Sequence, residues 1–239
     1  MTTLPRPRPS LEGVASAGRA LTLLSAFRKG DDSVPLAELA ARTGLVKTTI
    51  LRLAISMEEH GYLTRLPDGA YRLGAELFRL GSIYQRSFRA EVHVMPALAK
   101  LVQATGESAS LYVRSGNQRL CLYRVDSPHP LRLHVRPGDM RPMDDSATAQ
   151  VLRLFENPAL PKAARTPLPI YTRAQTDPHI ASMATPVFGP GESFAGALTL
   201  SGPLTRLDQA AADRFARTLL AVAADLTRAL GGAVLHNAG

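Results

Sequence analysis

Five residues near the start of this 239-residue chain have the types and spacing to bind a polyanion: Val46, Lys47, Thr48, Thr49 and Arg52. The cationic groups of Lys47 and Arg52 can donate hydrogen bonds to phosphate oxygens or to the acceptor edge of guanine. The two threonine hydroxyls can bond to a phosphate or a base, and Val46 can contact a thymine methyl group. These groups act together only if one structural element presents them on one face.

Two short helical patterns in residues 36–63, LAELAARTGLVKTTILRLAISMEEHGYL, can provide that element. Apolar residues recur at helical spacing in both, which predicts two helices that each bury one face; they are Leu36, Leu39 and Ala40, then Ile50, Leu53, Ala54 and Met57. Gly44 can adopt the left-handed backbone that ends the first helix, and Leu45 can fill the angle between the two. The segment therefore predicts a helix-turn-helix with residues 46–49 and 52 at the exposed start of the second helix.

A third helix and a hairpin are predicted beside this motif. Residues 17–27, AGRALTLLSAF, have one apolar face and can complete a three-helix bundle. The sequence YLTRLPDGAYRLG alternates around Asp68-Gly69, which predicts a tight hairpin, or wing. Arg65 and Arg72 flank that turn and could reach phosphates or the minor groove, although a basic, solvated hairpin explains them equally well.

The rest of the chain changes from helical to strand periodicity. Residues 75–106 are helical in pattern, as a linker helix followed by a helix of the next domain. From Ser108 the period becomes two, which predicts strands joined at 115–117, a third strand LRLHV from Leu131, and a further hairpin turning at 189–191. An amphipathic helix follows, with one apolar side formed by Phe215, Leu219, Val222, Leu226 and Leu230. The second half is therefore predicted to be α+β, with an antiparallel sheet flanked by helices.

Composition limits the possible classes of protein. The chain has 45% hydrophobic and 20% charged residues, typical of two modest globular domains. Its net charge of +8 suits a polyanionic partner, although scattered surface arginines give the same total. The single cysteine, Cys121, excludes an intrachain disulfide or a Cys-built zinc site and is typical of a core residue. The chain contains no apolar signal segment or spanning run, which predicts a cytoplasmic protein with no membrane partner and no cofactor.

Several segments together resemble the IclR family of bacterial transcription regulators. They are VASAGRALTLLSAF, residues 36–63, the wing ending YRLG and the late block MATPVFGPGESFAGALTLSGPLTR. The resemblance covers nearly the whole chain except its middle. It implies a winged helix-turn-helix joined by a helix to a GAF-like effector-binding domain, in a homodimer or a dimer of dimers. It also implies a double-stranded, pseudo-palindromic DNA operator, a small-molecule effector, and a phosphate contact by Arg19.

The expected organisation follows from that resemblance together with the patterns above. It is a flexible arm over 1–12, a winged helix-turn-helix domain over 13–75, a linker helix over 76–92, and an effector-binding and oligomerisation domain over 93–239 that is shortened around 156–182. A ligand that binds one spacing of two DNA-binding heads better than another would shift their population and thereby change DNA affinity.

Two other functions are open at this point. The winged helix could serve only protein contact or dimerisation, without DNA. The chain could instead be an enzyme that recruits Asp144, Asp145 or Ser146 with one of six histidines. Because no HExxH, GxSxG, Walker or GxGxxG pattern is present, we expect no catalytic site.

The segment PMDDSATAQ, residues 142–150, departs from the family pattern PLH.TA.GK. Asp144 stands in place of the usual His and Ser146 in place of Thr, at the start of a helix that borders the effector pocket in the family. Asp144 and Asp145 would repel a nearby anion, or they are an ordinary acidic first turn for a helix over 147–155.

These departures change the pocket that the resemblance implies. We expect the pocket to lie between the strands carrying Tyr112, Cys121 and Tyr123 and the turn at 144–146. Since the Pro-rich stretch around 156–182 is short, the pocket should be smaller or more open. A weak response to organic anions is expected, with a neutral or cationic ligand favoured.

Overall fold

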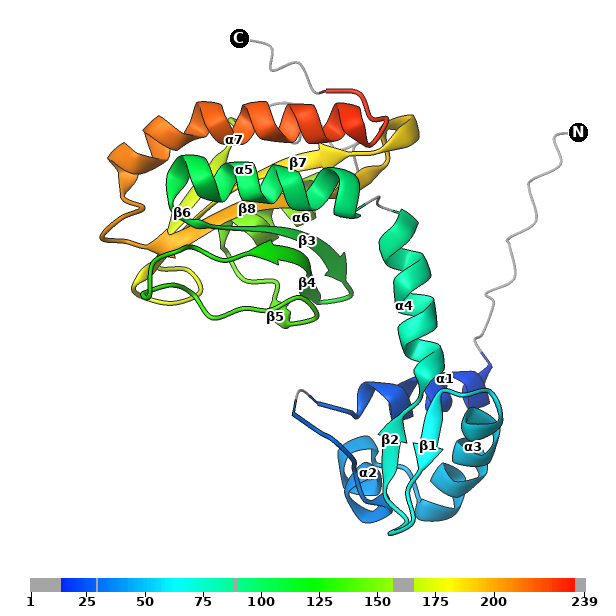
Figure 1. Ribbon diagram of the computed structural model, residues 1–239. Coiled ribbons are helices and arrows are strands. Elements are labelled where there is room, and N and C mark those ends of the chain that lie inside the picture. The colour runs from blue at the N-terminus through cyan, green and yellow to red at the C-terminus, as the bar shows by residue number, and fades with distance from the viewer. Residues whose placement is uncertain (1–13, 29, 88–89, 157–165, 235–239) are drawn as a thin grey trace, which may run out of the picture. The chain divides into compact units, whose positions relative to one another are not determined.

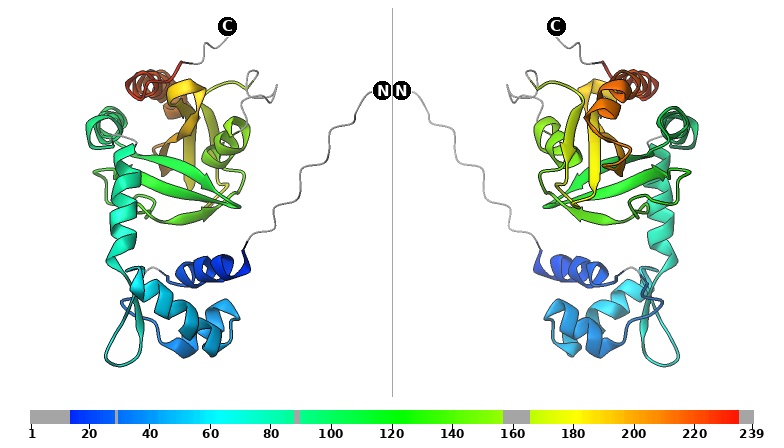
Figure 2. Two further views of the ribbon diagram at one scale, coloured as in Figure 1. Left: turned by 90° about the vertical axis from the view of Figure 1, so that its right-hand side faces the viewer. Right: turned by 90° about the vertical axis from the view of Figure 1, so that its left-hand side faces the viewer.

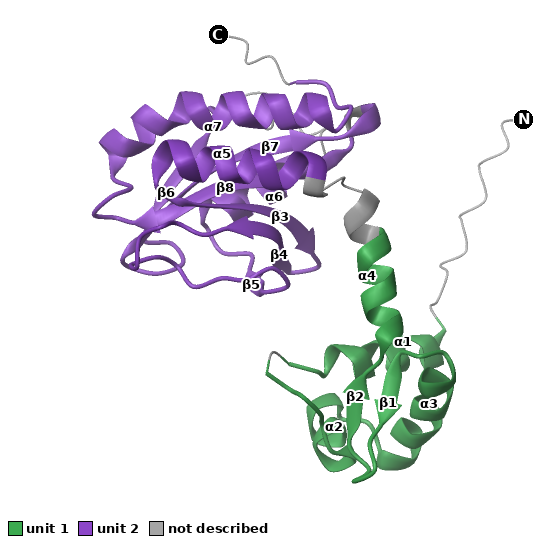
Figure 3. Ribbon diagram, viewed as in Figure 1, with its two compact units in different colours: residues 1–84 green, residues 85–239 purple. Residues whose placement is uncertain are grey.

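The computed structural model describes residues 14–28, 30–87, 90–156 and 166–234 (Figures 1 and 2). It divides the chain into two compact units, residues 1–84 and 85–239 (Figure 3). The division falls inside helix α4 (Ala75–Ser87), which occupies most of the stretch predicted as a linker helix. The predicted arm over 1–12 lies outside the described residues.

The described residues of unit 1 form three helices and a two-stranded antiparallel sheet before α4. Their bounds are α1 (Ala15–Ser25), α2 (Leu36–Thr43), α3 (Lys47–Glu59), β1 (Leu63–Arg65) and β2 (Tyr71–Leu73). Gly44 ends α2 with a φ of 70°, in the left-handed region, and the turn between β1 and β2 contains Gly69. These elements confirm the predicted helix-turn-helix, its third helix and its wing.

One apolar core holds these elements together. It buries Leu23 of α1, Leu39 of α2, and the predicted stripe Ile50, Ala54 and Met57 of α3. Leu45 packs against this core from the turn, as the sequence predicts. Because the stripe of α3 faces inward, its remaining faces are left to solvent.

Unit 2 is built on a six-stranded antiparallel sheet in the order β5-β4-β3-β8-β7-β6. The strands are β3 (Ser108–Ser115), β4 (Gln118–Val125), β5 (Met140–Pro142), β6 (Ile170–Arg173), β7 (Ile180–Phe188) and β8 (Phe194–Pro203). The helical elements are η1 (Ala90–Val94), α5 (Met95–Thr105), α6 (Ala147–Phe155), η3 (Pro190–Glu192) and α7 (Gln209–Ala229). The hairpins predicted at 115–117 and 189–191 are both present.

Helices cover both faces of this sheet (Figure 2). On one face α5 and α7 pack over a cluster that includes Leu111, Leu198 and Leu200. On the other face α6 buries Val151 and Phe155 against a second cluster. Successive strand residues point to opposite faces, so neighbouring residues of β8 belong to different clusters. The predicted α+β class is confirmed.

The predicted strand over 131–135 is wrong, because this segment pairs with none of the described strands. The edge strand is instead β5, which pairs with β4. In 131–135 arginine side chains bind the backbone carbonyls that a sheet ladder would have used: Arg124 donates to the carbonyl of Leu133 at 2.7 Å and Arg206 to that of Leu131 at 2.9 Å. Periodicity alone does not show such side-chain bonds.

Candidate nucleic-acid interface and polar cavity

The first turn of α3 presents the residues singled out from the sequence. Lys47, Thr48 and Arg52 are exposed, Thr49 is half-buried, and Val46 is 66% exposed. Val46 is the extended residue that precedes the helix, and no side chain caps the helix there. The first N–H groups of α3 therefore point outward with the positive end of the helix dipole. This is the geometry in which a helix terminus accepts a phosphate or a base edge.

The cations of this face are available to a partner. Among the described residues, the side chains of Lys47 and Arg52 have no ion-pair or hydrogen-bond partner. Arg42 in α2 differs, because it binds both Asp31 and Glu38, and the hydrogen bonds that it donates to these two carboxylates raise its pKa. Arg42 thus links α2 to the preceding loop through its ion pair with Asp31, whereas Lys47 and Arg52 form no such contact among the described residues.

The other predicted DNA contacts lie on α1 and on the wing. Arg19 is exposed on α1. Arg65 and Arg72 are exposed on β1 and β2, and the guanidinium of Arg65 lies 5.9 Å from the centre of the Tyr71 ring. Arg65 therefore has a packing contact of its own besides any role toward DNA.

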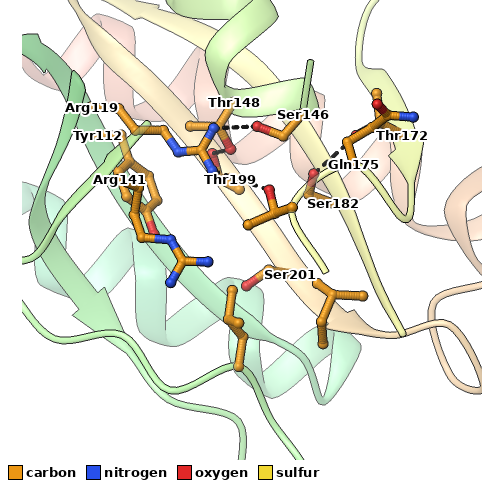
Figure 4. A pocket seen from close by; sticks show the side chains of 13 residues that line it. Tyr112, Arg119, Arg141, Ser146, Thr148, Thr172, Gln175, Ser182, Thr199 and Ser201 are labelled. Atoms are coloured by element: carbon orange, nitrogen blue, oxygen red, sulfur yellow. Dashed lines mark hydrogen bonds between the residues drawn. The ribbon is translucent and has the colours of Figure 1, made fainter. Parts of the chain in front are cut away.

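Unit 2 contains a polar cavity of about 30 Å³ on the α6 side of the sheet (Figure 4). Two arginines, a tyrosine and several hydroxyl side chains line it; its walls are Tyr112, Arg119, Leu133, Arg141, Ser146, Thr148, Thr172, Gln175, Thr176, Ile180, Ser182, Thr199 and Ser201. A space of this size holds about one or two water molecules. It is therefore a small site rich in hydrogen-bonding groups.

The hydroxyls of the cavity are connected to each other and to the start of α6. Thr148 and Thr199 lie 3.1 Å apart through their Oγ1 atoms, and Thr172 lies 3.2 Å from Ser182. The hydroxyl of Thr172 also accepts the N–H of Ala147 at 2.8 Å. Every buried polar side-chain atom among the described residues has a partner, so this network is complete.

Arg119 reaches into this network from β4 with only 4% of its surface exposed. Its guanidinium binds Asp144 through two nitrogens: Nη1 donates to Oδ1, and Nη2 donates to Oδ2 at 3.1 Å. Nη1 also donates to the hydroxyl of Ser146, and Nη2 donates to that of Thr176 at 3.2 Å. The buried positive charge is thus matched by one carboxylate.

The ionised form of Asp144 is strongly favoured. Burial alone would raise the pKa of its carboxyl, but hydrogen bonds from Arg119, Ser146 and Thr176 outweigh that effect and hold the pKa at about 2. Burial also raises the pKa of Tyr112 to about 12, which keeps its hydroxyl protonated and able to donate. Asp144 is therefore an anion, and Tyr112 is neutral, at neutral pH.

The structure brings some of the predicted effector residues to this cavity and not others. Tyr112 and Ser146 line it, and Asp144 binds its Arg119. Cys121 is buried in the adjoining apolar cluster, where burial raises its pKa to about 11. Tyr123 packs in the cluster on the opposite face, and the side chain of Asp145 is 82% exposed. Cys121, Tyr123 and Asp145 are therefore outside the cavity lining.

Sequence reasoning missed the residue that dominates the site, Arg119. A charged residue in an alternating strand is typical of an exposed position, and only the pairing with Asp144 reveals otherwise. Thr199 and Ser201 were also missed, although polar residues at i and i+2 within an apolar strand mark one face. The preference for a neutral or cationic ligand assumed two unpaired carboxylates; because Arg119 neutralises Asp144 and Asp145 faces solvent, that assumption is wrong.

The described parts of the chain contain neither a metal-binding cluster nor a membrane-spanning helix. No cluster of three or more His, Cys, Asp or Glu residues there could hold a metal ion. No helix among those residues is long and apolar enough to cross a bilayer.

Comparisons with known proteins agree with this architecture. Residues 16–67 match the family model of the IclR helix-turn-helix domain. The chain is 26% identical to the transcriptional repressor IclR of Escherichia coli K12 over 254 residues, covering 94% of this chain and 93% of the repressor. The fold is similar to that of a protein described as an IclR transcriptional regulator from Silicibacter sp. TM1040, with a TM-score of 0.79, 24% identity, and coverage of 93% and 99% of the two chains.

A second solved structure is an IclR homolog from Microbacterium hydrocarbonoxydans in complex with 4-hydroxybenzoate. Its TM-score is 0.69 at 20% identity, covering 90% of this chain and all of that chain. The winged helix-turn-helix, the antiparallel sheet of unit 2 and the long alignments with regulators all agree, and the relatives are regulators rather than enzymes. Residues 16–67 form a helix-turn-helix domain of the IclR type, and the chain, which is similar to IclR regulators over nearly its whole length, is a DNA-binding transcription regulator.

Proposed function

We propose that α3 reads its operator in the major groove with Lys47, Thr48, Thr49 and Arg52, assisted by an apolar contact from Val46. The observation that carries this proposal is the exposed, uncapped first turn of α3, with two cations that have no partner among the described residues. Arg19, Arg65 and Arg72 contact phosphates around that turn, which sets orientation rather than sequence preference.

Specific recognition of an operator needs two DNA-binding domains. A single small module typically buries only about 600–1,000 Å² against DNA, less than most specific complexes. We infer a homodimer, or a dimer of dimers, on a pseudo-palindromic operator, because twofold protein symmetry is matched by twofold DNA symmetry. A regulator acting on DNA in this way works in the cytoplasm.

The polar cavity of unit 2 is the proposed effector site. The relative from Microbacterium hydrocarbonoxydans holds 4-hydroxybenzoate, and ligand pockets are typically about 300 Å³ or larger. The cavity of about 30 Å³ in this chain is far below that size, so an aromatic acid enters only if the site rearranges. An effector that binds one conformation better shifts DNA affinity, and operator DNA must alter effector affinity by the same factor.

Footprinting on the DNA upstream of the chain's own gene tests this function. We expect two symmetric half-sites and an affinity that falls with salt. Arg65→Gln and Arg72→Gln should each reduce the slope of log affinity against log salt concentration by about 1, without changing the base preference. Arg217→Gln, at an exposed arginine on α7, is the matched control and should leave both unchanged. A monomer bound to one unpaired half-site would contradict the proposal.

A further inference from the structure

We propose that Arg119, Ser146 and Thr176 form a carboxylate-binding site that the chain fills with its own Asp144. This inference rests on the proposed role of the polar cavity as the effector site. It states which chemical group that site recognises and why an external organic anion does not reach it.

The carboxylate of Asp144 is bound as completely as a small-molecule carboxylate would be. Oδ1 accepts hydrogen bonds from Arg119 Nη1, from the N–H of Ser146 at 3.1 Å and from its hydroxyl at 2.6 Å. Oδ2 accepts from Arg119 Nη2 at 3.1 Å and from the hydroxyl of Thr176 at 2.8 Å. A two-nitrogen fork on both oxygens, joined by a backbone N–H and two hydroxyls, is the usual means of carboxylate recognition.

The donors come from separate parts of unit 2 and converge on one point. Arg119 lies on β4, Ser146 immediately precedes α6, and Thr176 follows β6. Arg119 and Ser146 are 4% and 3% exposed, so these donors are shielded from water. A surface ion pair would not need such convergence, because water would satisfy the same groups.

The turn that carries Asp144 is itself held in place by α6. Arg153 donates to the carbonyls of Met143 and Asp144, and Gln150 donates to the carbonyl of Asp145 at 2.7 Å. The carboxylate is therefore presented to Arg119 by a fixed backbone, and little freedom is lost when the pair forms. A tethered group of this kind competes at a high effective concentration, at least millimolar.

An external carboxylate must displace Asp144 to reach Arg119. The space beside the pair is only about 30 Å³, too small for an organic acid in addition to the residues present. The low pKa of Asp144, about 2, means that lowering the pH to ordinary acidic values does not vacate the site. The wild-type cavity is therefore already occupied by the group that it recognises.

Chemical rescue tests this occupancy in the full-length chain. Asp144→Gly removes the whole side chain, whose methylene and carboxylate together match acetate. Asp144→Ala removes only the carboxylate, which matches formate. We expect both variants to melt at lower temperature than wild type. Acetate should raise the melting temperature of Asp144→Gly, and formate that of Asp144→Ala, saturably and by about 3 °C or more over chloride at equal ionic strength. Wild type should show no saturable response to either anion.

Two controls make the test specific. Asp145→Gly removes the neighbouring carboxylate, which is 82% exposed, and should show no rescue by acetate. Adding Arg119→Gln to Asp144→Gly should abolish the rescue. A saturable acetate response of wild type that is lost in Arg119→Gln would overturn the proposal, and this measurement does not depend on the folding of any Asp144 variant.

Absence of rescue in folded Asp144→Gly and Asp144→Ala would also overturn it. The melting assay contains no DNA, so its outcome is independent of operator binding. Failure of rescue with intact operator binding rejects only the internal carboxylate. Successful rescue in a protein that binds no operator rejects only the proposed function.

Discussion

Lys47 and Arg52 in unit 1 and Arg119 in unit 2 carry the same charge in opposite surroundings. The first two are exposed and have no partner among the described residues, whereas Arg119 is 4% exposed and bound to Asp144. A cation in water carries no desolvation penalty and remains available to a polyanion, but a buried cation must be paired for the fold to persist. Exposure therefore decides which of these cations is still free to bind something else.

The largest effect should come from breaking the buried pair. Arg119→Met removes the cation and leaves the charge of Asp144 with fewer partners in a partly buried place. We expect the free energy of unfolding of unit 2 to fall by about 3–5 kcal/mol, measured by urea denaturation of the full-length chain. Lys47→Met, which removes an exposed cation, should change it by less than about 0.5 kcal/mol.

The double variant separates lost charge balance from lost packing. Arg119→Met combined with Asp144→Ala leaves no lone charge, so it should be more stable than Arg119→Met alone. Equal stability of the single and double variants would show that the pair does not act as a unit.

A second, smaller effect should appear in operator binding. Lys47→Ala or Arg52→Ala should weaken it by about 1–3 kcal/mol if the side chain contacts a base edge, and the preference at one base position should relax. The unfolding free energy should stay within about 0.5 kcal/mol of wild type, because neither side chain belongs to the core. Wild-type affinity in both variants, measured by titration of labelled operator, would argue against this orientation of α3.

The smallest effect concerns the turn that positions α3. A Cβ at Gly44 would meet no atom within 4 Å, so Gly44→Ala adds only the strain of a φ of 70°. We expect a loss of about 1–2 kcal/mol in unfolding free energy. Gly18→Ala is the matched control, since Gly18 is equally unobstructed but lies within the right-handed helix α1. That change should stabilise unit 1 by roughly 0.5–1 kcal/mol, and equal losses in both variants would refute the backbone argument.

Unit 1 was predictable from the sequence almost element by element. The apolar spacing of α2 and α3, the stop at Gly44 and the hairpin at Asp68-Gly69 all depend on residues close together in the chain. The same holds for the faces of α7 and for the hairpin between β3 and β4. Periodicity reports which face is buried, and turn chemistry reports where a helix or strand ends.

In unit 2 the sequence indicated Tyr112, Asp144 and Ser146, but the convergence of Arg119 and Thr176 on Asp144 was decided by tertiary structure. Arg119 meets Asp144 across 25 residues, and Thr176 meets Asp144 across 32. Whether these groups converge depends on strand register and on the path of the chain into α6, which the sequence pattern does not encode locally. The sequence suggested that Asp144 and Asp145 would repel an anion. In the folded chain Asp145 is exposed, and Asp144 is bound to the buried guanidinium of Arg119.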